Sequence, residues 1–157
     1  MSGSPARVKG SLLDRLTNPR ASENGLSLRE YHASVRRDLE ALLNARRPRA
    51  PVPPGLPAVR DSMFAYGLPD YASGAFNAAE QREALCREIA ATIKRFEPRL
   101  SPPITVTPLD RPDSMEPVLR IRIQAMLVAE DADEPVSFET VLDTTTADIA
   151  VRADTNG

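Results

Sequence analysis

The hydrophobic residues of this chain follow one period in its first two thirds and another in its last third. After residue 27 they recur at three- and four-residue steps, the pattern of an amphipathic helix: Leu28, Tyr31, Val35, Leu39, Leu42 and Leu43. Ser27 and Glu30 form a capping-box pattern at the start, because the two side chains can satisfy each other's free N–H groups. Pro48 cannot continue a helix, so the pattern predicts a helix that runs to Arg47.

A second long helix is predicted before residue 98. Asn77 is a suitable cap with Glu80 three residues later, and Pro98 ends the pattern. The predicted buried side follows helical spacing: Leu85, Cys86, Ile89, Ile93 and Phe96. Between the two helices, the proline-rich residues 49–55 predict an extended spacer, residues 59–66 one short helix, and residues 67–71 an ordered turn.

The last third of the chain alternates between apolar and polar residues, which predicts strands that bury one face. The alternating stretches are residues 104–107, 119–124 and 136–142, and residues 149–151 add a short apolar run. Residues 110–117 are rich in turn formers and predict a hairpin loop. Helices first and strands afterwards are typical of an α+β fold, with N-terminal helices packed on a C-terminal antiparallel or mixed β-sheet.

Residues 1–26 are polar and are interrupted by prolines and glycines. They contain one apolar island, which is formed by Leu12, Leu13 and Leu16. A terminal segment with few contacts of its own is mobile when free, so residues 1–26 are expected to form a flexible interaction segment. Residues 27–157 are expected to form a single domain. The sequence leaves open whether the island packs on the chain's own core or on a partner.

Composition and charge narrow the class of protein. The 157 residues contain 20 Lys and Arg against 22 Asp and Glu, and this net charge of −2 argues against a nucleic-acid-binding protein. The chain has no run of about 18 apolar residues, so no insertion into a membrane is expected. Cys86 is the only cysteine, and no apolar signal follows the first basic residues, so a cytoplasmic location is expected.

No pattern of catalytic or metal-binding residues stands out. His32 and Cys86 are the only imidazole and thiol, and they lie on different predicted helices. His32 is expected to face solvent, and Cys86 is expected to be an inert core residue. Phosphate-binding loops have no match, and the acidic residues of 130–134 lack a calcium-loop pattern. We therefore expect no catalytic residue, no cofactor and no metal ion.

Two features remain open to more than one interpretation. A basic stripe interleaved with aromatic residues would favour nucleic-acid binding. The arginines that come closest alternate with acidic residues and have no aromatic residues between them, so a solvated helix face is expected: Arg36, Arg37, Arg46, Arg47 and Arg49. Glycosidase chemistry needs two carboxylates at a set separation. Among 22 acidic residues the sequence selects no such pair and excludes none.

The sequence Glu97-Pro98-Arg99 places a charge pair between the second long helix and the first strand. Proline disfavours the helical conformation for the residue before it, so the pair is expected on a bent, extended segment. Opposite charges at such a place either clamp two segments of the same chain or pair with charges on another chain. The residues alone do not decide between these two interpretations.

Several fragments, taken in order, resemble the TssE family of type VI secretion baseplate proteins. The fragments are residues 11–16, 34–44 with Arg46 and Arg47, 66–71, 96–100, 119–127 and 134–142. The family's Glu-Pro-Arg signature maps onto Glu97, Pro98 and Arg99, and its Gly-Leu-Pro-Asp turn onto residues 67–70. The spacer between residues 48 and 57 is richer in proline than the family pattern. TssE itself resembles the small wedge protein of contractile phage baseplates, a family that carries an old lysozyme-like label.

The resemblance implies an α+β fold and a structural, non-enzymatic role in a cytoplasmic baseplate. The implied partners are the wedge subunits TssF, TssG and TssK and the tail sheath subunits TssB and TssC. An unpaired sheet edge would exchange a strand with the sheath, and Glu97 and Arg99 would fix the junction. Alanine at either position is then expected to abolish sheath assembly while the isolated domain stays folded. The alternatives are a peptidoglycan glycosidase, which the lysozyme-like label suggests, and a small adaptor of unrelated clients.

Overall fold

The structure, a computed structural model, describes residues 7–48, 53–70, 78–109, 117–129 and 133–153. Its N-terminal elements are β1 (Arg7–Val8), α1 (Leu12–Thr17), α2 (Pro19–Asn24), β2 (Leu26–Ser27) and the long helix α3 (Leu28–Asn44). They are followed by α4 (Pro57–Arg60), the 3₁₀ turn η1 (Met63–Ala65) and the long helix α5 (Ala79–Phe96). Four strands complete the chain: β3 (Leu100–Pro108), β4 (Val118–Leu127), β5 (Glu134–Asp143) and β6 (Ile149–Ala153). The helices precede the main sheet, which confirms the α+β prediction.

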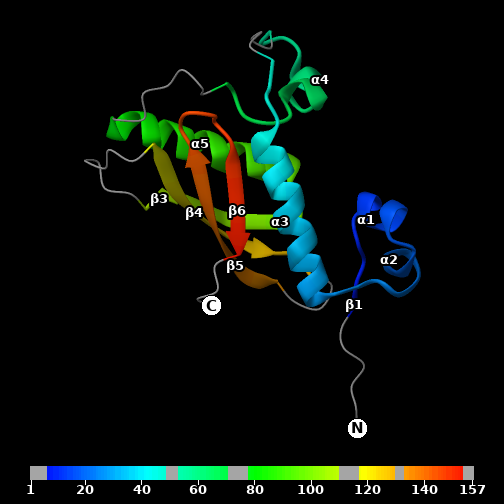
Figure 1. The fold of residues 1–157 in the computed structure, drawn as a ribbon. Helices are drawn as coiled ribbons and strands as arrows, with labels where there is room; N and C mark the ends of the chain where they lie inside the picture. The colour runs from blue at the N-terminus through cyan, green and yellow to red at the C-terminus, as the bar shows by residue number, and fades with distance from the viewer. Residues whose placement is uncertain (1–6, 49–52, 71–77, 110–116, 130–132, 154–157) are drawn as a thin grey trace.

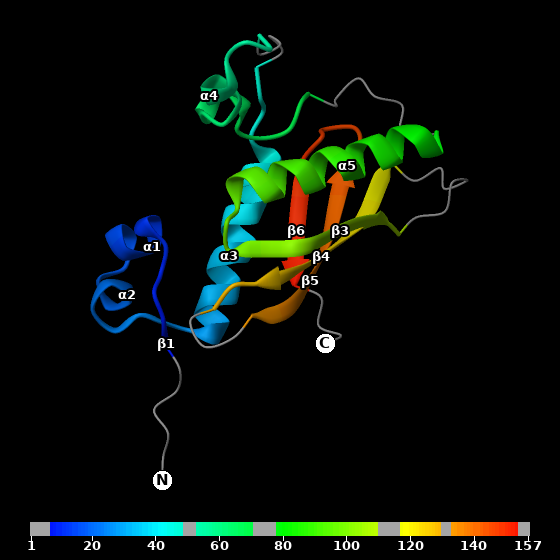
Figure 2. The same ribbon diagram turned by 180° about the vertical axis from the view of Figure 1, so that it is seen from behind.

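The four C-terminal strands form one antiparallel sheet in the order β3-β4-β5-β6. Alternate residues of each strand face the core, as the alternation in the sequence predicted; on β4 these include Leu119, Ile121 and Ile123. Helix α3 packs beside β6 and helix α5 packs against β3, and the two views of the ribbon show both helices (Figures 1 and 2). Their apolar sides and the sheet share a single hydrophobic core.

Helix α3 begins as predicted and ends three residues earlier than predicted. Ser27 and Glu30 form the capping box, in which the Ser27 N–H donates to the Glu30 carboxylate at 2.8 Å. The helix ends at Asn44 because the chain then pairs with the turn at residues 67–68. The Arg47 N–H donates to the Leu68 carbonyl, and the Leu68 N–H donates to the Ala45 carbonyl, each at 2.9 Å.

The turn at residues 67–70 is ordered at its described positions, as expected. Gly67 has a φ of 95°, and a Cβ at this position would collide with the backbone of Ala45. The single helix predicted for residues 59–66 is wrong, because two short pieces, α4 and η1, occupy this region. The break occurs at Ser62, whose hydroxyl accepts from the Phe64 N–H and so caps η1.

Some expectations fall on residues outside the described ranges. They are the Asn77 cap of α5, parts of the spacer at residues 49–55, most of the loop at residues 110–117, and residues 130–132. Within the described part, α5 is preceded by Ala78 and ends before Pro98, as predicted. Leu85, Cys86, Ile89 and Ile93 are buried, whereas Phe96 is only half-buried.

The N-terminal segment folds back onto α3. Strands β1 and β2 pair, and their residues Val8 and Leu26 reach the hydrophobic core. Helices α1 and α2 lie on the side of α3 that faces away from the sheet, as both ribbon views show (Figures 1 and 2). The segment is therefore anchored to the core through its strands, while Leu12, Leu13 and Leu16 of α1 remain exposed.

Candidate protein-interaction groove

The Glu-Pro-Arg turn connects α5 to β3 and holds an ion pair inside the molecule. Glu97 is the C-cap of α5 and is only 4% exposed. The Arg99 guanidinium donates to both carboxylate oxygens of Glu97, from Nε to Oε1 and from NH2 to Oε2, each at 2.7 Å. Pro98, between them, has an exposed side chain. Of the two interpretations that the sequence left open, the structure shows the clamp within one chain.

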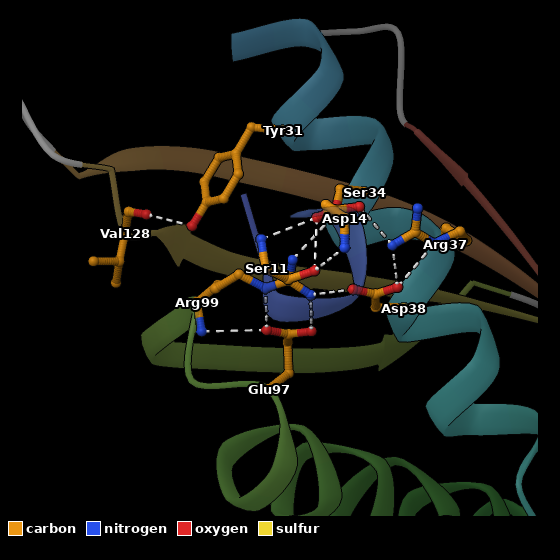
Figure 3. A network of polar contacts seen from close by, with 9 residues as sticks. All are labelled: Ser11, Asp14, Tyr31, Ser34, Arg37, Asp38, Glu97, Arg99 and Val128. Carbon is orange, nitrogen blue, oxygen red and sulfur yellow. Dashed lines mark hydrogen bonds and ion pairs between the residues drawn. The ribbon is translucent and has the colours of Figure 1, made fainter. Parts of the chain in front are cut away.

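The same guanidinium reaches across to helix α3. Arg99 NH2 donates to Oδ2 of Asp38 at 2.7 Å, and NH1 donates to the Ser34 hydroxyl at 3.2 Å. Ser34 and Asp38 are one helical turn apart, so both side chains point toward the Glu-Pro-Arg turn. One arginine therefore joins the end of α5 to the middle of α3 (Figure 3).

Helix α1 joins this polar network through Asp14, which is buried. The Ser34 hydroxyl donates to Asp14 Oδ2 at 2.6 Å, and Arg37 NH2 donates to Oδ1 at 2.9 Å. Ser11 caps α1 and donates to the same carboxylate from its hydroxyl at 2.7 Å and from its N–H at 3.0 Å. Figure 3 shows that these side chains converge from three parts of the chain.

The electrostatics of the network favour its charged forms. Burial alone would raise the pKa of Asp14, but hydrogen bonds from Ser34, Ser11 and Arg37 outweigh burial and lower this pKa to about 2. Burial opposes the charge of Arg99, yet the contacts with Glu97 and Asp38 raise the pKa of its guanidinium above the ordinary value. The Asp14 carboxylate and the Arg99 guanidinium therefore stay ionised at neutral pH.

A groove of about 480 Å³ opens above this network. Its lining residues come from α1, α3, the turn after η1 and the end of α5: Ser11, Leu13, Asp38, Ala41, Leu42, Tyr66, Phe96, Glu97, Pro98 and Arg99. The rings of Tyr66 and Phe96 pack edge to face on one another, with centroids 5.4 Å apart. The groove thus combines apolar walls with charged side chains at its base, which suits contact with another protein better than binding of a small polar molecule.

The groove unites residues that the sequence singled out separately. Leu13 lines it together with Glu97, Pro98 and Arg99. Leu12 and Leu16 are 69% and 75% exposed on the neighbouring helix α1, and neither lines the groove. Sequence reasoning missed Asp14 and Asp38 as site residues. The pattern Ser11-x-x-Asp14 of the α1 capping box was the available signal for the first of them.

The two edges of the main sheet differ in their accessibility. The outward N–H and C=O groups of β6 are satisfied by α3: Asn44 contacts both groups of Ile149 at 2.9 and 2.7 Å. For Val151, Glu40 accepts from the N–H at 2.8 Å, and Arg36 donates to the carbonyl at 3.0 Å. These three side chains act as a strand substitute, so no further strand can pair with this part of β6.

Strand β3 forms the other edge, and within the described residues no strand lies outside it. The Leu109 N–H donates to the Arg120 carbonyl at 2.8 Å, so the backbone groups of Leu109 point toward β4. In an antiparallel strand, the backbone N–H and C=O groups of successive residues point to alternate sides of the strand. The backbone groups of Ile104 and Val106 therefore point outward, as does the carbonyl of Pro108. Proline at 108 fits this position because it lacks an N–H.

The comparison with known protein families now identifies the chain. A profile of the family described as "Baseplate wedge protein gp25" matches residues 29–132, which are 104 of the 157 residues. The chain belongs to the gp25 baseplate wedge family. This wedge-family region contains α3, the Glu-Pro-Arg turn, β3 and β4, and most of the groove. The segment with Leu12, Leu13 and Leu16 lies before it. No curated protein and no solved structure shows a significant match to the chain.

Other predicted features of this wedge-family chain are corrected by the structure. The arginines expected on one solvated helix face do not lie on one element, because α3 ends before Arg46 and Arg47, and Arg49 lies outside the described residues. Arg37 and Arg46 are exposed, yet both bind other elements. Arg46 donates to the Ala147 carbonyl at 2.8 Å, and Arg47 pairs with Glu88 of α5 at 2.7 Å. His32 is half-buried rather than solvent-facing, with Nε2 3.2 Å from a Glu134 oxygen.

Three further observations concern metal binding, the single thiol and membrane-spanning helices. Within the described ranges, no three His, Cys, Asp or Glu side chains are grouped so that they could hold a metal ion. Cys86 is buried as predicted, and burial raises the pKa of its thiol. Among the described residues, no helix is long and apolar enough to cross a membrane.

Proposed function

We propose that this chain is the TssE-type structural subunit of a type VI secretion baseplate. The observation that carries the proposal is the family match, which includes an intact Glu-Pro-Arg turn clamped to α3 at the base of an apolar groove. In this role the protein acts in the cytoplasm, joins wedge subunits and helps to start the tail sheath. It works through surfaces that it offers to other proteins.

The proposed contact with the wedge subunits TssF, TssG and TssK is the groove together with the exposed side of α1. Leu12, Leu13 and Leu16 are all more than half exposed, and large apolar side chains gathered on one short helix favour a protein contact. Residues 1–26 would then act as an interaction segment of the domain at residues 27–157. Pro98 would contact the partner through its exposed side chain. Glu97 and Arg99 would instead hold the lining of the groove in position.

The proposed contact with the sheath subunits TssB and TssC is the β3 edge. Because α3 already occupies the outward groups of β6, strand exchange is assigned to Ile104 and Val106 on β3. Prolines at 102, 103 and 108 bracket these residues, so the paired stretch would be short. The Glu-Pro-Arg turn lies directly before β3 and so sets where this edge begins.

We infer that the chain does not hydrolyse peptidoglycan. A glycosidase needs a carboxylic acid that stays protonated near neutral pH, which requires a raised pKa. Asp14 has a lowered pKa, and the carboxylates of Asp38 and Glu97 are each bound by the Arg99 guanidinium at 2.7 Å, so none of the three matches such an acid. Clearing of isolated cell walls by the purified chain, lost on one Glu or Asp substitution, would restore the glycosidase alternative.

Co-purification of the full chain with TssF and TssG tests the wedge contact. Leu16→Glu is expected to reduce recovery of both partners at least fivefold without changing the melting temperature, because Leu16 is 75% exposed. The matched control is Met63→Glu, since Met63 is 88% exposed on η1 and lies outside the groove. Equal recovery for wild type and Leu16→Glu would contradict the α1 contact. Failure of the wild-type chain to recover either subunit would contradict the proposed function, and an adaptor role would then remain.

A further inference from the structure

Helix α1 presents two leucines to solvent on the side that faces away from α3. Asp14 points toward α3, and positions two residues away lie on nearly the opposite side of a helix. Leu12 and Leu16 therefore face outward, and they are 69% and 75% exposed. Neither residue lines the groove, so the two leucines form a separate surface beside it.

The contacts of Asp14 hold α1 in this orientation. A helix of six residues is marginal in water on its own, so other contacts have to fix it. The Asp14 carboxylate accepts four hydrogen bonds, two from Ser11 and one each from Ser34 and Arg37. The leucines are therefore displayed on a preorganised helix, which lowers the entropic cost of binding a partner.

The N-terminal part of the chain has a positive charge, unlike the remainder. Residues 1–30 contain five lysines and arginines and three acidic residues, a net charge of +2, whereas the whole chain has −2. The rest of the chain therefore carries −4. One of the three acids, Asp14, is buried and bound by Arg37 of α3, so the exposed charges of this part are more positive still.

Arg15 places a cation next to the leucines. It lies three residues after Leu12, so the two side chains are neighbours on the surface of α1. Lys9 precedes the helix, and Arg20 lies on α2, which contacts α1. All three cations are exposed, and within the described residues their side chains have no hydrogen bond and no ion pair. Their charges are therefore available to a partner.

Helix stability does not account for these cations. Arg15 suits the last turn of α1, because the carboxyl end of a helix is negative. Arg20, however, stands in the first turn of α2, at the positive end, where a cation is unfavourable. Lys9 lies outside any helix. A partner of opposite charge accounts for all three.

We infer that the exposed side of α1 docks on an acidic surface of another baseplate protein. This inference rests on the proposed structural role and adds to it the chemistry of the partner. Leu12 and Leu16 enter an apolar recess, and carboxylates at its rim pair with Arg15. An anionic bilayer would also attract an apolar and basic surface, but a helix of six residues offers little apolar area to hold one.

Substitutions at Arg15 test the sign of the partner's charge. The full-length wild type and the variants Arg15→Lys, Arg15→Gln and Arg15→Glu are titrated into the purified complex of TssF and TssG at low ionic strength. All four residues are good helix formers, so the variants differ mainly in charge. Arg60→Glu is the matched control, because Arg60 is also exposed and unpaired among the described residues but lies on α4.

Arg15→Lys is expected to bind like wild type, Arg15→Gln about threefold more weakly and Arg15→Glu about tenfold more weakly. These differences should shrink toward unity in about 0.5 M NaCl, because salt screens exposed charges. Arg60→Glu should stay within about twofold of wild type at either salt concentration. Equal affinities of the Arg15 variants would indicate a neutral partner surface, and tighter binding by Arg15→Glu a basic one. Either result overturns the inference and leaves the proposed function intact.

Three other outcomes are separable from these. Co-sedimentation of the wild-type chain with phosphatidylserine vesicles that is lost in Arg15→Glu would assign the surface to a lipid bilayer and would overturn the inference. Self-association of the chain alone that is lost in the same variant would assign the surface to a second copy and would also overturn it. Absence of binding by the wild-type chain to the TssF and TssG complex would contradict the proposed function and, with it, the partner chemistry derived from it.

Discussion

Arg99 connects three segments that are far apart in the sequence. Its guanidinium binds Glu97 at the end of α5 and both Ser34 and Asp38 on α3. Its backbone carbonyl accepts from the Val128 N–H at 2.8 Å, and the Val128 carbonyl accepts from the Tyr31 hydroxyl at 3.0 Å. The residue thus links the groove to the end of the sheet (Figure 3).

Arg99→Ala is expected to lower the free energy of unfolding by about 3 kcal/mol, because it leaves the buried Glu97 carboxylate without its cation. Urea denaturation at neutral pH measures this loss. Arg87→Ala is the control and should cost less than about 1 kcal/mol, since the side chains of Arg87 and its partner Glu83 are 72% and 64% exposed. Equal losses for the two variants would contradict the central place of Arg99. The sequence alone suggested that Glu97→Ala and Arg99→Ala would abolish sheath assembly in a domain that stays folded. Because Glu97 is buried, we expect both variants also to lose stability, which would contribute to any assembly defect.

Asp14 should make the stability of the chain depend on acid pH. Its folded-state pKa of about 2 lies below the ordinary value of 3.8, so its contribution is complete above about pH 4 and is lost as pH falls toward 2. Asp14→Asn is therefore expected to lower the free energy of unfolding by about 2 kcal/mol at neutral pH. The difference between wild type and variant, measured by urea denaturation, should diminish progressively below about pH 4. A difference that is independent of pH would contradict the lowered pKa.

The sequence predicted only some of the residues at the candidate site. It selected Glu97, Pro98 and Arg99 and the leucines of residues 12–16, and the groove brings Leu13 and the Glu-Pro-Arg turn together. Ser34 and Asp38 were not selected, because polar residues on an amphipathic helix look like its solvated side. Their role depends on an arginine more than 60 positions away, and local spacing carries no information about such a contact.

Among the secondary-structure elements, periodicity predicted those with a strong apolar pattern. Both long helices and all four C-terminal strands form where the spacing of apolar residues placed them. The prediction was wrong in two places, one decided by a tertiary contact and one by a local cap. Helix α3 stops before Arg47 because the chain pairs with Leu68, and the expected helix at residues 59–66 is broken by the Ser62 cap.

The asymmetry between the two sheet edges leads to a prediction for β3. Val106→Pro removes an outward N–H and is expected to reduce the number of sheaths per cell at least tenfold, because Pro cannot donate to an added strand. Val106→Ala is the matched control: it loses similar packing, retains the N–H, and should form sheaths in normal number. Fluorescently labelled sheath subunits in a deletion strain complemented with each variant provide the count. Normal sheath numbers with a stably expressed Val106→Pro protein would contradict strand exchange at this edge.

For the whole molecule, the order of helices before strands was enough to predict an α+β fold. The arrangement of its two proposed contact surfaces was not predictable from the sequence. The Glu-Pro-Arg turn lines the groove and leads directly into β3, so one turn connects the groove with the start of the open edge. Contacts made at the groove and at the edge are therefore held in a fixed relation by the Arg99 network.

The central claim is that this chain joins baseplate and sheath by offering these two surfaces together. A cryo-electron microscopy map of an assembled baseplate that contains the chain tests it most directly. The account predicts that a wedge subunit covers the groove at Leu13 and Pro98, and that a sheath strand pairs with Ile104 and Val106. A map in which both surfaces face solvent would contradict it.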